Sequence, residues 1–154
     1  MIVYRIAKLK KRATDLSGMG AYKDGGRWNN AGTYMLYTSE NSSLAYLENL
    51  VHFEIENSPP NLYMMSIELK VDDTLIYKLP DKIYPVNWQE IGNLQNKRIG
   101  DELMEERKFL GIKTRSAINK SEYNYLLNPL FPGYHELVSV RLVEELAVDA
   151  RLVK

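Results

Sequence analysis

The most informative stretch of this sequence is Gly25-Gly26-Arg27-Trp28-Asn29. Two adjacent glycines permit backbone conformations that other residues avoid, and Gly26 leaves space for a ligand beside the chain. They precede Arg27, whose planar guanidinium suits phosphate or carboxylate groups. Residues 13–33 contain five glycines and little periodicity, and a loop of that length in a compact domain is usually functional. We expect Trp28 to anchor this loop in the core and Arg27 to bind an anion.

A predicted strand and helix follow the loop. Residues 34–37 form a brief apolar stretch, and Tyr37 at its end can line the same cleft as the loop. Ser39 or Asn41 can cap a helix that runs to about residue 53. This helix contains the second informative motif, Leu44-Ala45-Tyr46-Leu47-Glu48.

Glu48 occupies an unusual position on this helix. At about 100° per residue, Leu44, Leu47 and Val51 define the predicted buried stripe, and Glu48 falls between them. Burying a lone carboxylate costs several kcal/mol. We therefore expect Glu48 either to pair with a buried cation or to face a cleft. The alternative is a partly exposed glutamate at the edge of the stripe.

Length and charge restrict the class of protein. At 154 residues the chain has the length of one ordinary domain, 1–154, and its 45% hydrophobic and 26% charged residues are typical of a globular protein. The 20 lysines and arginines balance 20 aspartates and glutamates. The chain therefore has no net positive charge that would attract nucleic acid or an anionic membrane. We expect the basic run at residues 8–12 to be a solvated strand end and loop.

Residue usage excludes several kinds of site. The sequence has no cysteine, which rules out disulfides, thiolate nucleophiles and sulfur ligands. Its two histidines, His52 and His135, have no spacing that pairs them for zinc. No stretch resembles a signal peptide or is apolar enough to span a bilayer. We expect a cytoplasmic protein that binds neither a metal nor a membrane.

Hydrophobic periodicity predicts an α+β fold. Helices are expected at 41–53 and 93–109, with a short helical turn at 121–127. The region 80–92 is expected to be irregular, with Trp88 as a plug. Strands are expected at 2–7, 34–37, 65–70, 74–79, 113–119, 137–143 and 147–153. Because strands and helices intersperse without regular βαβ alternation, we predict a single compact domain with a mixed or antiparallel sheet and flanking helices.

Other polar residues carry weaker signals. Ser116 has no Gly-x-Ser-x-Gly elbow, and a catalytic triad would have to recruit His52 or His135 without local support. A hydrogen bond to phosphate or ribose is a better role for Ser116, and a plain strand serine is the alternative. Asn124 and Asn128 resemble turn and cap residues. Neither a phosphate-binding P-loop nor a Rossmann glycine motif is present.

Taken in order, several motifs resemble the RES domain family. This family is named for an arginine, a glutamate and a serine, which correspond here to Arg27, Glu48 and Ser116. The resemblance extends over nearly the whole chain. Its motifs are Tyr4-Arg5, Gly25-Gly26-Arg27-Trp28-Asn29, Tyr37-Thr38-Ser39-Glu40, Leu44-Ala45-Tyr46-Leu47-Glu48, Ser116-Ala117 and Asn124-Tyr125-Leu126-Leu127-Asn128-Pro129.

The resemblance implies a fold and an activity. RES proteins are toxins of bacterial toxin–antitoxin pairs, with an Xre-type helix-turn-helix antitoxin and a fold similar to that of ADP-ribosyltransferases. They consume NAD as a substrate and need no separate cofactor. Members are associated with hydrolysis, with phosphorolysis and with transfer of ADP-ribose to a protein.

The same resemblance assigns roles to residues. Glu48 would stabilise positive charge on the ribose as the nicotinamide bond breaks, and Arg27 would clamp the pyrophosphate. Tyr37 would stack on or orient the nicotinamide, and Ser116 would bond a phosphate or ribose oxygen. Further candidates for substrate binding are Gly26, Trp28 and Asn128.

Two residues of this chain depart from the family pattern. Arg115 stands where the family usually has proline, and this change can loosen the strand or add a cation to the site. Phe131 stands where the family often has histidine.

Two alternative functions remain possible from the sequence. An endoribonuclease toxin using Arg27, Glu48 and His52 is one alternative, although the neutral charge disfavours it. A non-catalytic module for a phosphorylated ligand is another. The sequence leaves the acceptor of ADP-ribose and the oligomeric state, including a homodimer, undecided.

Overall fold

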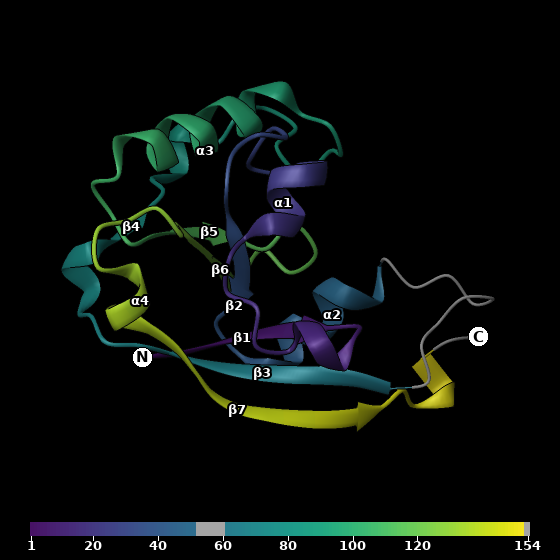
Figure 1. The fold of residues 1–154 in the computed structure, drawn as a ribbon. Helices are drawn as coiled ribbons and strands as arrows, with labels where there is room; N and C mark the ends of the chain where they lie inside the picture. Colours follow the sequence, from purple (N-terminus) through teal and green to yellow (C-terminus); the bar gives the residue numbers. More distant parts are fainter. Residues whose placement is uncertain (52–60, 153–154) are drawn as a thin grey trace.

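A seven-stranded sheet forms the centre of the computed structural model, which describes residues 1–51 and 61–152 (Figure 1). The strand order is β4-β5-β6-β2-β1-β3-β7, and every neighbouring pair is antiparallel except β4 and β5. The predicted α+β class with a mixed sheet is confirmed. The strands are β1 (Ile2–Ala7), β2 (Leu36–Ser39), β3 (Asn61–Leu69), β4 (Ile76–Lys78), β5 (Gly111–Arg115), β6 (Tyr123–Leu127) and β7 (Val138–Ala147).

Helices lie against this sheet. In Figure 1, α3 runs across the top of the molecule, and β3 and β7 lie along its lower side. The α-helices are α1 (Met19–Asp24), α2 (Ser42–Leu50), α3 (Leu94–Glu106) and α4 (Tyr134–Leu137), and short 3-10 helices occupy Lys10–Arg12, Asp73–Leu75, Asp81–Ile83 and Ala150–Leu152. Within the described residues no helix is long and apolar enough to cross a membrane.

The two faces of the sheet bury different clusters. On one face Val3, Leu36 and Leu127 pack with α4 through Tyr134. We call the opposite face the α3 face. Its cluster joins the sheet to α3 and to the glycine-rich loop, and consists of Trp28, Met35, Leu79, Met104, Ile112 and Leu126. Because side chains alternate along a strand, Tyr37, Asn124 and Ser116 share the α3 face with Leu126 and Ile112.

Three predicted elements were wrong. The turn expected at 121–127 is strand β6, because its residues complete ladders with β2 and β5. The loop expected at 13–33 contains helix α1. The strand expected at 137–143 continues to Ala147 as β7, which pairs with β3 over its whole length and contains a β-bulge. The strand expected at 147–153 was wrong, because Ala150–Leu152 form a 3-10 helix. For β6 and β7, pairing with distant strands outweighed the local pattern.

Helix α2 begins as predicted but buries a different stripe. The Asn41 side chain caps it by accepting a hydrogen bond from the Leu44 amide at 2.7 Å. Leu44 is buried, whereas Leu47 and Val51 are 37% and 59% exposed. The predicted stripe through all three leucine and valine positions was therefore wrong, because α2 meets β1 and β2 through its first turns. The helix ends at Leu50 with Val51 as its C-cap, and residues 52–53 of the predicted extension lie outside the described residues.

Gly100 sets how closely α3 approaches the glycine-rich loop. A Cβ atom at this buried position would lie 1.6 Å from the Trp28 carbonyl oxygen and 2.8 Å from its carbon. We expect Gly100→Ala to destabilise the protein by about 2 kcal/mol or more, since backbone on both sides must shift. Urea unfolding measures this loss. Gly20→Ala is the matched control, because that helical glycine has no atom within 4 Å. It should stabilise slightly, by about 0.5 kcal/mol. Equal effects of the two changes would contradict this account.

Candidate active site on the α3 face

Glu48 reaches from α2 to the sheet. Its Oε1 accepts a hydrogen bond from the Ser116 hydroxyl at 2.6 Å and another from the Asn124 amide at 2.8 Å. Asn124 Oδ1 in turn accepts from the Ser39 hydroxyl at 2.8 Å. The carboxylate is half-buried. Among the described residues two neutral donors, and no buried cation, hold Glu48. Its partial exposure agrees with the alternative of a glutamate at the edge of the stripe, and a cleft beside it stays a prediction.

Ser116 acts on Glu48 in this arrangement. Its side chain is fully buried, and its oxygen also accepts hydrogen bonds from the amides of Ile118 and Asn119 at 3.2 and 3.1 Å. A serine hydroxyl has only one proton to donate. That proton goes to Glu48 in this structure, and the hydrogen bond from Ser116 to a phosphate or ribose oxygen stays a prediction.

Arg27 holds a neighbouring loop. Its Nη1 donates to the carbonyl oxygens of Trp88, Gln89 and Glu90 at 3.2, 2.8 and 3.3 Å. Within the described residues all its hydrogen bonds leave from this one nitrogen, so Nε and Nη2 donate to no described residue. The Gln89 amide donates to the Ala117 carbonyl at 3.2 Å, which ties the loop to the residue beside Ser116.

The Tyr37 hydroxyl holds the glycine-rich loop (residues 13–33) by two hydrogen bonds. It donates to Asn29 Oδ1 at 2.7 Å and accepts from the Trp28 amide at 3.0 Å. Burial raises the pKa of Tyr37, so the hydroxyl stays protonated. Gly26 is needed here, because a Cβ atom would lie 2.6 Å from the Tyr37 hydroxyl oxygen. The hydroxyl is therefore committed to the loop, and the ring packs against the core cluster of the α3 face.

Removal of the Tyr37 hydroxyl tests this support. We expect Tyr37→Phe to lower the free energy of unfolding by about 1–2 kcal/mol, since a partly buried amide and a buried carboxamide oxygen lose their partners. Tyr22→Phe is the control, because Tyr22 is 37% exposed and stacks on Tyr34 through its ring. Urea unfolding that shows no difference between the two variants would contradict the supporting role.

Two predicted substrate-binding residues are interior. Trp28 is 3% exposed and packs edge-on against Tyr84 with ring centroids 5.8 Å apart, as expected for the anchor of the loop. Asn128 is 1% exposed, and its amide donates to the Met104 carbonyl at 2.9 Å while its oxygen accepts from the Leu130 amide. Asn128 therefore joins β6 to α3, and the structure does not bring its side chain to Glu48 or Arg27.

The two departures from the family pattern have separate structural roles. The Arg115 guanidinium bonds Asp81 at 3.1 Å and the Lys120 carbonyl, so it adds no cation beside Glu48. Its backbone amide donates to the Tyr84 hydroxyl, a bond that proline cannot make. Phe131 packs against the core cluster on the α4 side of the sheet.

The structure thus brings Glu48 and Ser116 into direct contact. It also places Arg27 and Gly26 in the glycine-rich loop, next to Tyr37 of β2. The two groups share the α3 face and are connected through Gln89. No ion pair joins Arg27 to Glu48 within the described part of the chain. His52 lies outside the described residues, and among those described no three His, Cys, Asp or Glu residues could hold a metal.

Sequence reasoning missed Asn124 and Thr114 as parts of this site. Asn124 was interpreted as a turn residue, although strand alternation would have placed it beside Ser116. Thr114 pairs with it across β5 and β6 and is 1% exposed, and its hydroxyl has no hydrogen-bond partner among the described residues. Because Thr114 lies opposite Asn124, it is a further polar group on the α3 face. A buried hydroxyl without a partner costs stability.

Comparison with known proteins identifies the family. The family model described as "RES domain" matches residues 2–149. The chain belongs to the RES domain family. This RES domain aligns over most of its length with relatives that are named as toxins. It is 32% identical over 153 residues to "Toxin Res" of Yersinia enterocolitica, covering 99% of each chain. It is also 31% identical over 146 residues to "Prs ADP-ribosylating toxin" of Sphingobium sp., covering 92% of this chain and 89% of that one.

A solved structure shares the fold. The crystal structure of the M. tuberculosis MbcT-MbcA toxin-antitoxin complex contains a chain that superposes on this RES domain with a TM-score of 0.65 at 17% identity. The superposition covers 95% of this chain and 84% of that one. The predicted single α+β domain therefore has the same fold as a chain of this complex.

Proposed function

We propose that this RES domain consumes NAD by breaking its nicotinamide–ribose bond, and that it is the toxin of a toxin–antitoxin pair acting in the cytoplasm. Relatives named as toxins, one of them as an ADP-ribosylating toxin, support this proposal. The observation that carries it is the Glu48 carboxylate, which two hydrogen bonds orient on the same face as Arg27.

Glu48 supplies the main catalytic effect in this proposal. Loss of nicotinamide leaves positive charge on the ribose, and a fixed carboxylate stabilises that charge more strongly in the transition state than in the ground state. Both recorded hydrogen bonds fall on Oε1. Oε2 is then the oxygen that faces the ribose. Because Ser116 and Asn124 hold the group before substrate arrives, little reorganisation is needed during the reaction.

Arg27 and Tyr37 bind the substrate in this proposal. Arg27 has Nε and Nη2 for the pyrophosphate while Nη1 stays on the 88–90 carbonyls, so one residue connects the loop and the substrate. The Tyr37 ring, fixed through its hydroxyl, lies on the same face and orients the nicotinamide. Loop residues that bind substrate can therefore be ordered before binding, which reduces the entropy cost.

We further propose an antitoxin of the Xre type as the partner. A solved structure that contains the same fold is a toxin-antitoxin complex, which supports a separate neutralising chain. An NAD-consuming protein must be silenced in the cell that makes it. Co-expression with that antitoxin should restore growth and keep cellular NAD at its normal level.

One experiment tests the proposed function. Purified protein is incubated with NAD, with and without inorganic phosphate, and the products are identified by mass spectrometry. Release of nicotinamide is expected. ADP-ribose as the other product assigns hydrolysis, its 1-phosphate assigns phosphorolysis, and a mass increase on an added protein assigns transfer. Cleavage of total RNA without loss of NAD would overturn the proposal in favour of an endoribonuclease, and tight NAD binding without turnover would favour a binding module.

A further inference from the structure

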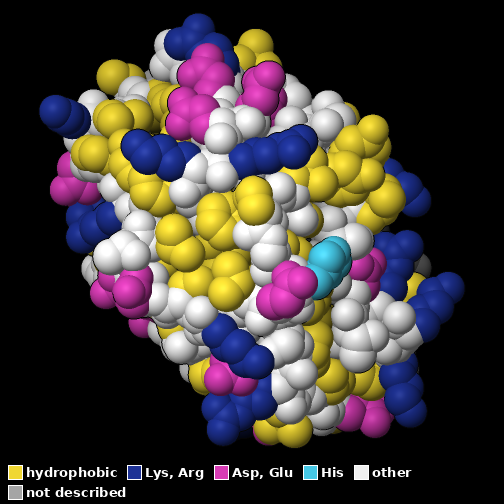
Figure 2. Space-filling view, turned by 60° about the vertical axis from the view of Figure 1, so that its left-hand side comes forward, with side chains coloured by type: hydrophobic (Ala, Val, Ile, Leu, Met, Phe, Trp, Pro, Cys, Tyr) yellow, Lys and Arg dark blue, Asp and Glu magenta, His cyan; other side chains and the backbone are white. Residues whose placement is uncertain are grey.

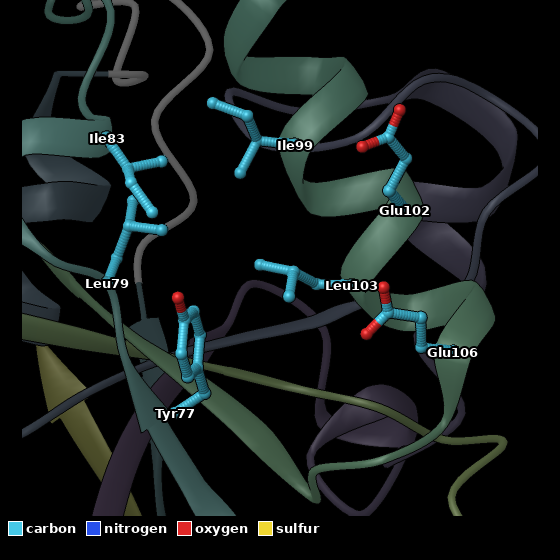
Figure 3. Close-up of a pocket in the computed structure, with 7 residues that line it drawn as sticks. All are labelled: Tyr77, Leu79, Ile83, Ile99, Glu102, Leu103 and Glu106. Carbon is cyan, nitrogen blue, oxygen red and sulfur yellow. The ribbon is translucent and has the colours of Figure 1, made fainter.

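A cavity lies apart from the residues proposed for NAD cleavage. Its volume is about 180 Å³, and α3 forms one wall while β4 and the following 3-10 helix form the other (Figure 3). In Figure 3, Ile99 and Leu103 point from α3 toward Leu79 and Ile83. The lining residues are Tyr77, Leu79, Ile83, Ile99, Glu102, Leu103 and Glu106. We call this cavity the α3 groove.

The floor of the α3 groove is apolar because of how α3 is rotated. The helix turns Asn96, Gly100 and Met104 into the domain. Ile99 and Leu103 are consequently left on its flank, only half-buried, and Ile83 opposite them is 37% exposed. Apolar side chains gathered in one exposed depression lose contact with water when a partner covers them.

The rim of the α3 groove is acidic. Glu102, Glu105 and Glu106 are exposed and line a second hollow beside the groove. On the face shown in Figure 2, acidic side chains gather near the top, at the height of α3, and Lys and Arg side chains lie between them and a hydrophobic area below. The whole chain has a net charge of zero, so this acidity is local.

These carboxylates are placed where the helix itself gains nothing from them. The last turn of α3 has no basic residue, although cations are favoured at the C-terminal end of a helix. Glu102 faces like charges three and four positions later, which costs rather than contributes stability. Within the described residues the only ion pair of this rim is Arg98–Glu102, at 3.9 Å between highly exposed side chains.

We propose that the α3 groove docks a basic amphipathic helix of a partner protein. Its apolar residues would cover Ile99 and Leu103, and its lysines or arginines would meet Glu102, Glu105 and Glu106. A helix that lies in a groove in this manner is a common mode of recognition. Charge complementarity selects a basic segment, because an acidic one would meet repulsion from three carboxylates. The proposal does not depend on NAD turnover.

A model peptide tests the proposal on the full-length protein. The probe is a helical peptide about 18 residues long, with leucine at every third or fourth position and lysine on both flanks. A scrambled peptide of the same composition is its control. Calorimetry should show that the amphipathic peptide binds roughly tenfold more tightly than the scrambled one. In NMR spectra the amide shifts should map to Ile99, Leu103 and their neighbours.

Charge reversal distinguishes the groove from general attraction. The double variant Glu102→Lys with Glu106→Lys should weaken binding roughly tenfold or more, whereas Glu136→Lys with Glu144→Lys, which makes the same change in net charge elsewhere, should have little effect. All four side chains are exposed, so thermal unfolding should show both variants folded. Equal binding of the scrambled peptide, equal losses in both double variants, or shifts that map away from α3 would overturn the proposal.

Discussion

Glu48→Gln is expected to lower kcat for NAD cleavage by roughly 10²–10³-fold or more, which is the range found when an electrostatic stabiliser of a transition state is removed. The change is nearly isosteric. The glutamine oxygen can still accept the hydrogen bonds of Ser116 and Asn124, so the negative charge is lost while the packing stays. KM for NAD should change little, because the charge acts on the transition state.

Initial rates of nicotinamide release measure this effect, and thermal unfolding checks that the variant is folded. Glu136→Gln on α4 is the matched control and should keep full activity, because Glu136 is exposed and lies outside the candidate site. A Glu48→Gln variant that turns over NAD at the wild-type rate would remove Glu48 from the mechanism.

Arg27→Ala is expected to reduce kcat/KM for NAD by about 100-fold, equivalent to about 3 kcal/mol for a charge-assisted contact with the pyrophosphate. It should also lower the free energy of unfolding by about 1 kcal/mol, because the carbonyl oxygens of residues 88–90 lose their shared donor. Arg27→Lys keeps the charge without the planar fork and should recover only part of the activity.

Nicotinamide riboside separates the two roles of Arg27. This substrate has the reacting bond but no pyrophosphate, so wild type and Arg27→Ala should cleave it at similar low rates if Arg27 acts through the pyrophosphate. The comparison forms a cycle that isolates the contact between residue and substrate. An equal loss on both substrates would mean that Arg27 acts only by holding the loop.

The accuracy of the sequence-based predictions followed the range of the interactions involved. Strand β1 and the alternation of β3 depend on residues close in sequence, and both were predicted. The cap of α2 was predicted as Ser39 or Asn41, and the structure has Asn41. Strand β6 was wrongly predicted as a turn, because its conformation is set by ladders with β2 and β5, which belong to distant parts of the chain. Local propensity does not contain that pairing.

For the candidate site, the amino-acid sequence alone determined the family and the residues that we propose for its chemistry, since Arg27, Glu48 and Ser116 stand in motifs that are specific together. Only the tertiary structure decided what each group contacts. The Ser116 proton goes to Glu48, and one nitrogen of Arg27 goes to the 88–90 carbonyls. The physical reason is that a hydroxyl has one proton and each hydrogen bond requires atoms within about 3 Å. Spacing along the chain therefore shows which groups are available, whereas folding determines which of them meet.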